Sequence, residues 1–194
     1  MASFEKEKHL VVLAVTVVAF LLAMADARRC PVHLRLYMHD IIGGPEQTAI
    51  HLIRDVGPPH ASLKGAHFGD TEAIDDLVTS GPGIDSGAVG RAQGTYMLSS
   101  QQEEVLVIAV TVALTDGPYN GSTFTVAGRV RIYDDTAEVA VVGGTGLLRR
   151  ATGYAVWRTA KVVSEVYIVV ELVVRMSVPA NAAPPGNGSS LAIE

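Results

Sequence analysis

The carboxylate best suited to chemistry in this sequence is Asp40. It ends the alternating segment 33–40 and shares a face with Leu34, Leu36 and Met38. A carboxylate on the apolar face of a strand is desolvated, which raises its pKa and suits it to proton donation. The alternation equally allows a second interpretation, in which Asp40 ends the strand at a rim and caps the turn that follows.

Tyr96 occupies an analogous position in segment 91–98. It is in phase with Ala92 and Gly94, whose small side chains would leave a cavity beside the tyrosine ring. A buried structural tyrosine is the alternative interpretation. The sequence therefore offers an acid and a phenol on the inner faces of two different strands.

The other polar residues give no sign of a metal or cofactor site. Asp75 and Asp76 are adjacent, so alternation sends only one inward, and the other is expected to be a solvated turn residue. His33 and His39 share a face but are too far apart to hold a metal unaided. There is no C-x-x-C, H-E-x-x-H or G-x-S-x-G motif, and the glycine-rich stretch 143–146 lacks the lysine and helix of a phosphate-binding loop. We expect no metal and no cofactor.

The elements that must position Asp40 and Tyr96 are strands. Turn signals divide the chain into short segments without helical periodicity, a pattern typical of an all-β sandwich or barrel. In segment 163–177 the even positions are mostly apolar and the odd positions include Glu171 and Arg175, so one face is expected to be core. The sequence predicts eight or nine strands, at residues 33–40, 48–54, 68–79, 91–98, 105–114, 122–133, 137–142, 149–158 and 163–177.

Segment 105–114 (VLVIAVTVAL) is apolar on both faces. Such a strand must be covered on both sides, by the interior of a barrel and by something outside it. A second copy of the chain is the simplest cover, so the sequence predicts a homo-oligomer, a trimer or a dimer. Closing the sheet into a barrel would also remove its exposed edges.

The N-terminal residues predict secretion. Two lysines precede an apolar run at 10–24, which ends in small residues at the spacing that a signal peptidase recognises. The run is short for a bilayer span, which needs about 20 apolar residues, so a signal peptide at 1–25 is favoured over a membrane anchor. One domain, 26–178, follows. The tail, 179–194, is rich in Pro, Gly, Asn and Ser, which predicts disorder.

Charge and cysteine content narrow the partners. The net charge of −5 argues against a nucleic-acid partner, which requires a basic face. After signal cleavage no stretch is apolar and long enough to engage a membrane. The single cysteine, Cys30, cannot form an internal disulfide, so the core must stabilise the fold.

Two sequences match the N-glycosylation acceptor pattern. They begin at Asn120, within a strong turn signal, and at Asn187, in the tail. Asn-Gly is also the commonest turn dipeptide, so the first match has a structural explanation as well. Given the predicted secretion, we expect Asn120 to be modified.

The sequence resembles the plant dirigent family over nearly all of residues 34–178. The resemblance implies an all-β, eight-stranded antiparallel barrel of the dirigent and allene oxide cyclase type, with a central apolar cavity, secreted to the apoplast and commonly trimeric. The matching pieces, which are highly specific in this order and spacing, are Leu36-Tyr37-Met38-His39-Asp40, Phe68-Gly69 with Asp75-Asp76, Gly81-Pro82, Val89-Gly90-Arg91-Ala92-Gln93-Gly94-Thr95-Tyr96, Asn120-Gly121-Ser122, Val141-Val142-Gly143-Gly144-Thr145-Gly146 and Gly153-Tyr154-Ala155.

The resemblance also implies a function. Dirigent proteins direct phenoxy radicals, made by a separate laccase or peroxidase, into one stereoisomer of a lignan-type product. Radicals couple without help, so the protein need only hold two of them in one orientation, in a cavity with apolar walls and a few polar anchors. Asp40 matches the family's pocket aspartate, a candidate acid for protonating a quinone methide, and Tyr96 matches a tyrosine that hydrogen-bonds to the phenol or stacks on it. The other expected substrate-binding residues are Leu36, Met38, Leu98 and Val130.

The sequence departs from the lignan-forming pattern at several pocket positions. Val130 and Ala137 stand where lignan-forming members carry an Asp and an Arg, and Leu98 replaces a second tyrosine. The C-terminal cysteine that often pairs with the N-terminal one is missing, which leaves Cys30 alone. These changes leave the fold assignment intact but remove the basis for assigning a lignan substrate.

Three functions are therefore compared. The first is a non-redox auxiliary that directs the coupling of monolignol-type radicals in phenylpropanoid metabolism or defence. The second is a dehydratase or cyclase that acts on a phenolic substrate through Asp40. The third is a non-catalytic defence protein that binds a phenolic or a glycan.

Overall fold

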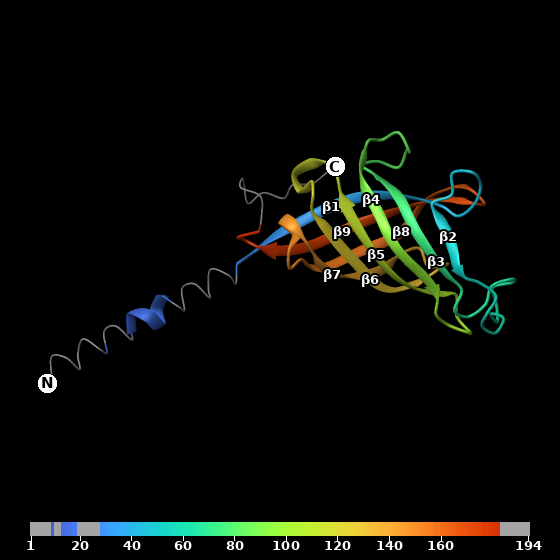
Figure 1. Cartoon of the computed structure of the whole chain (residues 1–194), viewed down its shortest axis with the longest axis horizontal. Coiled ribbons are helices and arrows are strands. Elements are labelled where there is room, and N and C mark those ends of the chain that lie inside the picture. The colour runs from blue at the N-terminus through green and yellow to red at the C-terminus, as the bar shows by residue number, and fades with distance from the viewer. Residues whose placement is uncertain (1–8, 10–12, 19–27, 183–194) are drawn as a thin grey trace.

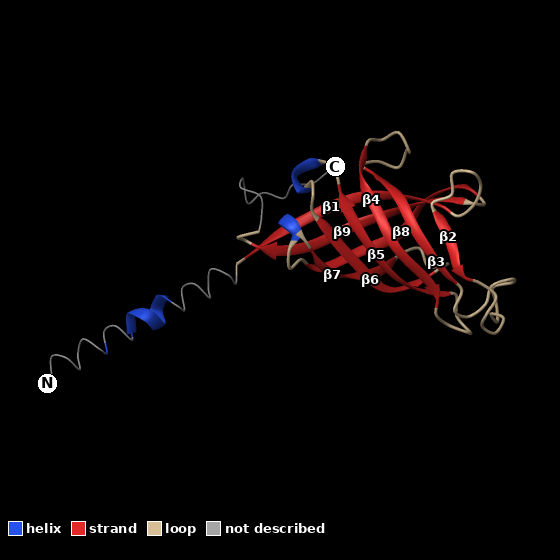
Figure 2. Ribbon diagram, viewed as in Figure 1, coloured by secondary structure: helices blue, strands red, loops and turns tan. Residues whose placement is uncertain are grey.

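Residues 28–182 form nine strands, eight of which close into a β-barrel (Figures 1 and 2). The structure is a computed structural model that describes residues 9, 13–18 and 28–182. None of the helices in these ranges has the length and hydropathy needed to cross a bilayer. The strands are β1 (Arg29–Ile41), β2 (Ala49–Ile53), β3 (Thr71–Thr79), β4 (Ala88–Leu98), β5 (Val105–Leu114), β6 (Thr123–Arg131), β7 (Ala137–Gly144), β8 (Thr152–Ser164) and β9 (Tyr167–Pro179), with short 3-10 helices η1 (Gly117–Tyr119) and η2 (Gly146–Leu148).

The sheet is antiparallel and closes on itself. Its order is β1-β9-β8-β7-β6-β5-β4-β3-β2, and an additional pairing of β1 with β3 completes the ring. β1 pairs with the C-terminal part of β3 through Tyr37, Met38 and His39, whereas β2 pairs with the N-terminal part. Eight strands thus form the closed barrel, and β2 continues the ring beside β3 beyond the end of β1. This confirms the predicted fold class.

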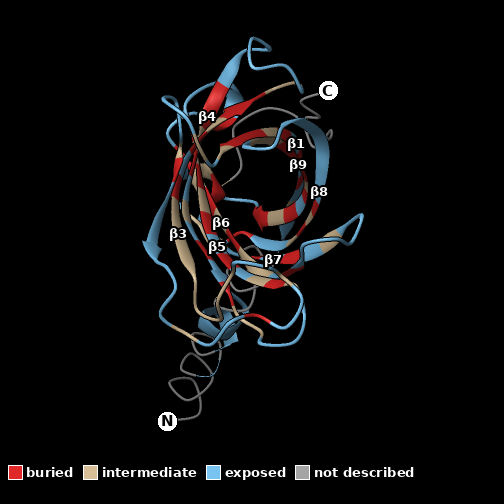
Figure 3. Ribbon diagram, turned by 90° about the vertical axis from the view of Figure 1, so that its right-hand side faces the viewer, coloured by how far each residue is buried: buried red, intermediate tan, exposed pale blue. Residues whose placement is uncertain are grey.

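Strand alternation fills the interior with apolar side chains. Figure 3, which looks at one end of the barrel, shows buried positions recurring along the strands around the ring. In β1 the even residues from Val32 to Met38 are buried, as are the even residues of β5 from Ile108 to Leu114. Each large aliphatic side chain removed from water in this way stabilises the fold by about 1.5–3 kcal/mol.

The last two strands differ from the sequence prediction. The sequence predicts strands at 149–158 and 163–177. Both strands form, but β8 continues to Ser164, and the chain turns at Glu165 and Val166 before β9 begins. Neither of these two residues is a type typical of turns, such as glycine, proline or asparagine. Both faces of the hairpin tip are exposed, so the burial pattern that marks a strand is lost there.

Glu171 is the exception to the polar-outside pattern. It lies on the outer face of β9 and is only 1% exposed, because three side chains cover it. Arg158 of β8 donates a hydrogen bond to its Oε2, Tyr37 of β1 donates to its Oε1 at 3.1 Å, and Arg35 lies 3.6 Å away. Burial raises the pKa of the Glu171 carboxyl, but these hydrogen bonds and arginine charges outweigh burial and hold it below its usual value.

This cluster joins β1, β9 and β8 on the outside of the barrel, so Glu171→Gln is expected to destabilise the protein by about 1–3 kcal/mol. Urea unfolding at pH 7 measures the loss. Glu165→Gln, at the exposed β8–β9 turn, is the matched control and should change the midpoint little. Equal midpoints for the two variants would show that the cluster does not stabilise the barrel.

Candidate functional site

Asp40 and Asp76 are the first inward positions of β1 and β3 beyond the end of the ladder that joins these strands. The β1–β3 ladder pairs Met38 with Val78, and each acid lies two residues beyond this pair on its own strand. Both positions are in the inward phase of their strands. Asp40 is 4% exposed and Asp76 0% exposed. The apolar-face interpretation of Asp40 is therefore the one that the structure adopts.

The hydrogen bonds of this pair are incomplete. The Thr48 hydroxyl accepts a hydrogen bond from the Ile41 backbone N–H at 3.1 Å and donates one to Asp76 Oδ1 at 2.5 Å. Asp40 Oδ1 and Asp76 Oδ2 are buried and have no hydrogen-bond partner. Each carboxyl thus keeps one free oxygen inside the barrel, where a polar group of a ligand can be recognised.

Burial and mutual repulsion favour the protonated forms of these acids. Burial, together with the negative charge of Glu72, raises the pKa of Asp40 to about 7. Burial and the charge of Asp40 raise the pKa of Asp76 to about 8, against the opposing effects of the Thr48 hydrogen bond and the Arg91 charge. In the described part of the chain, the buried polar and charged residues include no Lys or Arg that could neutralise the pair.

Tyr96 adds a phenol to the same interior. Its hydroxyl donates to the Met38 sulfur at 3.8 Å, and its ring meets that of Trp157 edge to face, with centroids 6.0 Å apart. Burial, and then the charges of Asp40 and Asp76, raise the pKa of Tyr96 well above its ordinary value. The phenol therefore stays protonated and can serve as a hydrogen-bond donor.

Gly94 lets the backbones of β4 and β5 approach closely. A Cβ at this position would lie 2.1 Å from the Ala109 carbonyl oxygen of β5, so glycine is needed here for strand packing. The cavity that Ala92 and Gly94 were expected to leave beside the Tyr96 ring stays a prediction.

The six expected site residues all lie on the inner face and are buried. A pocket of about 280 Å³ opens where β3 begins and β4 ends, and Tyr96 and Leu98 line it, together with Leu106 and Ile132. Its polar lining includes Glu72, which lies 3.1 Å from His51. Asp40, Leu36, Met38 and Val130 are not among its lining residues. The central apolar chamber expected to join them stays a prediction.

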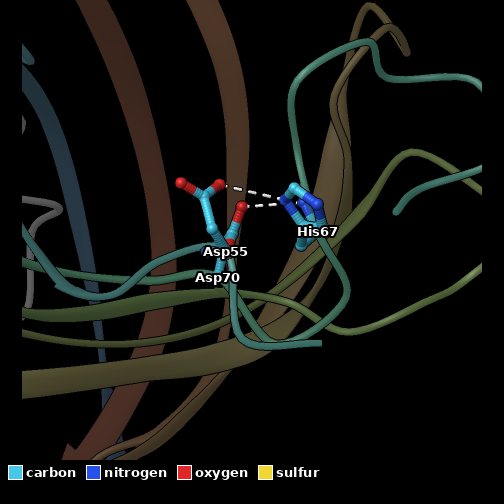
Figure 4. A group of neighbouring side chains, drawn as sticks. All are labelled: Asp55, His67 and Asp70. Atoms are coloured by element: carbon cyan, nitrogen blue, oxygen red, sulfur yellow. Dashed lines mark hydrogen bonds and ion pairs between the residues drawn. The ribbon is translucent and has the colours of Figure 1, made fainter. Parts of the chain in front are cut away.

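A second polar cluster lies outside the barrel interior. Figure 4 shows Asp55, His67 and Asp70 in and beside the connection between β2 and β3. Asp70 accepts hydrogen bonds from the backbone N–H of Asp55 at 2.9 Å and of His67 at 2.8 Å. His67 Nδ1 lies 3.0 Å from Asp55 Oδ1, at ion-pair distance but without hydrogen-bond geometry. These contacts between the three residues stabilise the connection between β2 and β3.

The sequence pointed to part of the acid site and missed the rest. Alternation required one of Asp75 and Asp76 to face inward, and the structure selects Asp76. Asp75 is exposed and pairs with Arg91 at 2.9 Å, on a strand rather than in a turn. Asp76 could have been identified because it is in phase with Ile74. Thr48 could not, because nothing local indicates that its hydroxyl reaches another strand.

The predicted modification sites are placed only in part. Asn120 is exposed in the turn after η1, and its glycosylation stays a prediction. Asn187 and most of the predicted signal peptide lie outside the described residues. Cys30 is half-buried in β1 and has no disulfide partner.

Comparison with known proteins gives a consistent set of relatives. The family model described as "Dirigent-like protein" matches residues 31–177. Two proteins named pterocarpan synthase 1, from Glycine max and Glycyrrhiza echinata, are 43% and 42% identical over 124 residues, covering 63% of this chain. The chain matches slightly less than two thirds of their own length, 65% and 64%. Dirigent protein 1 of Arabidopsis thaliana is 38% identical over 131 residues, 68% of this chain and 70% of that protein.

Solved structures agree with the sequence matches. The structure of a pterocarpan synthase dirigent protein matches with a TM-score of 0.69 and 36% identity, over 77% of this chain and 86% of the other. A second pterocarpan synthase dirigent protein matches with a TM-score of 0.67 at the same identity, over 77% and 95% of the two chains.

The raised pKa values of Asp40 and Asp76 predict that the protein loses stability as pH rises. The folded state holds protons that the unfolded chain releases near pH 4, so this contribution is complete below pH 4 and is lost as pH rises through about 7 and 8. In that window, each extra proton bound by the folded state lowers the free energy of unfolding by about 1.4 kcal/mol for every pH unit of increase. Urea unfolding from pH 4 to 9 measures the slope.

Asp40→Asn isolates this effect. Burial lowers the pKa of His39, which acts in the opposite direction, so the wild type is compared with the variant rather than read alone. The stability difference between them should shift in favour of the variant between pH 5 and pH 8. A pH-independent difference would mean that Asp40 titrates as an ordinary carboxylate.

Proposed function

Because the chain belongs to the dirigent family, we propose that it binds a phenolic substrate inside the barrel and acts on it as a dehydratase or cyclase, with Asp40 as the acid. The observation that carries this proposal is the Asp40 carboxyl, buried on the inner face with a free oxygen and a pKa near neutrality. Radical coupling itself needs no acid, and in that function an acid serves only the later protonation of a quinone methide. The similarity to two proteins named as synthases supports the same choice.

The proposed reaction is an acid-assisted loss of water. Asp40 gives its proton to a hydroxyl group on a carbon attached to the phenol ring, the C–O bond breaks and water leaves. The phenolic O–H releases its proton to the solvent, which yields a neutral quinone methide. A second hydroxyl of the same molecule then adds to the exocyclic carbon and closes a ring. The proton of that hydroxyl passes to the Asp40 carboxylate, and the quinone methide oxygen takes a proton back from the solvent to restore the phenol, so one water is lost overall. No electron is gained or lost, so no oxidant is required.

The other interior residues suit this chemistry. Tyr96, which stays protonated, can donate a hydrogen bond to a phenolic oxygen. Leu36, Met38, Leu98 and Val130 provide apolar surface that fits an aromatic ring and excludes the water that would trap a quinone methide at random. Stereochemical control then follows from holding the planar intermediate with one face toward the attacking hydroxyl.

Stereochemical direction of radical coupling is the second candidate function. The similarity to Arabidopsis thaliana dirigent protein 1 favours it, as does the largely apolar interior. It requires a laccase or peroxidase as the source of radicals. Under either proposal the protein is secreted to the apoplast after removal of residues 1–25 and is glycosylated at Asn120.

Asp40→Asn separates the two functions. With a racemic phenolic alcohol and no oxidase, the wild type should form the dehydrated or cyclised product, and the variant should lose about 100-fold or more in rate, because the amide cannot donate a proton to the leaving group. Chiral chromatography of the products measures both rate and selectivity. Asp75→Asn, which alters the neighbouring outward-facing acid, should keep full activity.

The same assay with laccase and monolignols tests the alternative. No turnover across a panel of phenolic alcohols, together with an altered enantiomeric ratio of coupled products when laccase is present, would replace the first function with the second. Saturable binding with no change in any product would leave only the binding function.

The outer face of β5 supports the predicted homo-oligomer. Val107 of β5 is 43% exposed, and it is paired with Met97 of β4, which is 41% exposed. Ala109 on β5 and Val142 on β7 are exposed on the same outer surface. Met97, Val107 and Ala109 thus form a small exposed apolar face, which Arg129 of β6 borders because it pairs with Val107, and we propose that a second copy covers this face.

Val107→Glu is expected to weaken this assembly, because it places a charge at the centre of the apolar face. Sedimentation velocity at several concentrations should show an oligomer for the wild type and a shift toward the monomer for the variant. Val162→Glu, at the exposed tip of the β8–β9 hairpin, is the control. A monomeric wild type at all concentrations would exclude the oligomer.

A further inference from the structure

We propose that Asp76 is the second member of an acid–base pair with Asp40, in which the two carboxyls hold a single proton between them near neutral pH. This inference rests on the proposed function, because it assigns a residue to the same site. It goes further because it treats the acid as two coupled carboxyls, one on β1 and one on β3. Asp76 acts through Asp40, so it is a positioning residue.

The first support is the register. The β1–β3 ladder ends at His39 and Leu77, and the next inward positions on the two strands are Asp40 and Asp76. Thr48 lies between the two strands at this point, since its hydroxyl contacts the Ile41 backbone N–H and the Asp76 carboxyl, and the charge of Asp40 acts on Asp76. Two buried carboxylates that interact in this way repel each other when both are ionised, so the second ionisation is less favourable than the first.

The second support is the environment of the pair. Glu72 of β3 and Tyr96 of β4 face it from the inside, and neither brings a positive charge. The residue paired with Asp40 on β9 is Ile168, and the residue paired with Asp76 on β4 is Ala92. Arg91 and Asp75 influence Asp76 from the outer face, where they are paired with each other. A proton is therefore the available means of neutralising one carboxyl.

The third support is the asymmetry that Thr48 imposes. Its hydroxyl donates to Asp76 Oδ1 at 2.5 Å, much closer than its other acceptor, the His39 carbonyl oxygen at 3.5 Å, while its oxygen accepts from the Ile41 N–H. This hydrogen bond favours the ionised form of Asp76, whereas Asp40 has no such donor at its free oxygen. Burial and the charge of Asp40 outweigh this hydrogen bond and raise the pKa of Asp76 to about 8, against about 7 for Asp40, so the Thr48 donor narrows the difference between the two acids and allows them to share the proton.

Infrared and carbon NMR titration of the substrate-free protein, labelled with ¹³C at aspartate side chains, tests the pair directly. In the wild type the two carboxyls should lose their protons in two steps separated by more than one pH unit. In Asp76→Asn, Asp40 should titrate in one step whose midpoint lies at least about one pH unit below the upper step of the wild type. Asp75→Asn, one residue away but outward-facing, should shift the midpoints much less.

A second variant keeps the test decisive if Asp76→Asn does not fold. Thr48→Val removes the hydroxyl donor and leaves both acids in place, so the upper step, which belongs mainly to Asp76, should move to higher pH. Two independent, overlapping titrations in the wild type, or unchanged steps in both variants, would overturn the shared proton. Because no substrate is present, these results do not depend on turnover. A coupled pair without any turnover would refute the proposed enzyme function alone.

Discussion

The pairing of β1 with β3 is the contact on which the rest of the structure depends. It joins only Tyr37, Met38 and His39 to their partners, yet it converts an open nine-stranded sheet into a closed barrel. The side-chain period of a strand is two, so a slip of one residue in this ladder would turn the acidic inward positions out to solvent. β1 is held in register on its other side by β9, with which all thirteen of its residues pair. The short ladder therefore depends on the long one.

Closure in this register has an energetic cost that the apolar core must offset. Two carboxyls sit inside a wall of aliphatic side chains, and each would be less costly to the fold as an aliphatic residue of similar size. The repulsion between them adds to this cost at high pH. Positions that break the general rule of an apolar interior are where function is expected, because stability alone does not account for them.

The sequence was sufficient for the features that depend on alternation. It predicted the bounds of β5 and the phase of Tyr96, because a buried strand face repeats every second residue, whereas for Asp40 it left the rim position open as an alternative. Val130 was identified from the family resemblance rather than from alternation. The sequence failed at the β8–β9 turn, where both faces are exposed and the turn residues are ordinary ones. It also gave no sign that Gly94 is needed for the close approach of the β5 backbone. Thr48 shows the general limit, since a hydrogen bond between a loop and a distant strand leaves no local pattern.

The polar side chains inside the barrel lie on one part of its wall, which favours proton transfer to a substrate from that part. The acidic side chains come from β1 and β3, with the Tyr96 phenol next to them on β4. The facing wall of β5 to β8 is apolar, and it includes Val130 and Ala137, the positions where the lignan-forming pattern has an acid and a base. A substrate bound between these walls would place its aromatic surface against the apolar side and its hydroxyl groups toward the carboxyls. Proton transfer at one edge of the molecule is the chemistry that such an interior allows, and it needs only the acids that β1 and β3 already bring together.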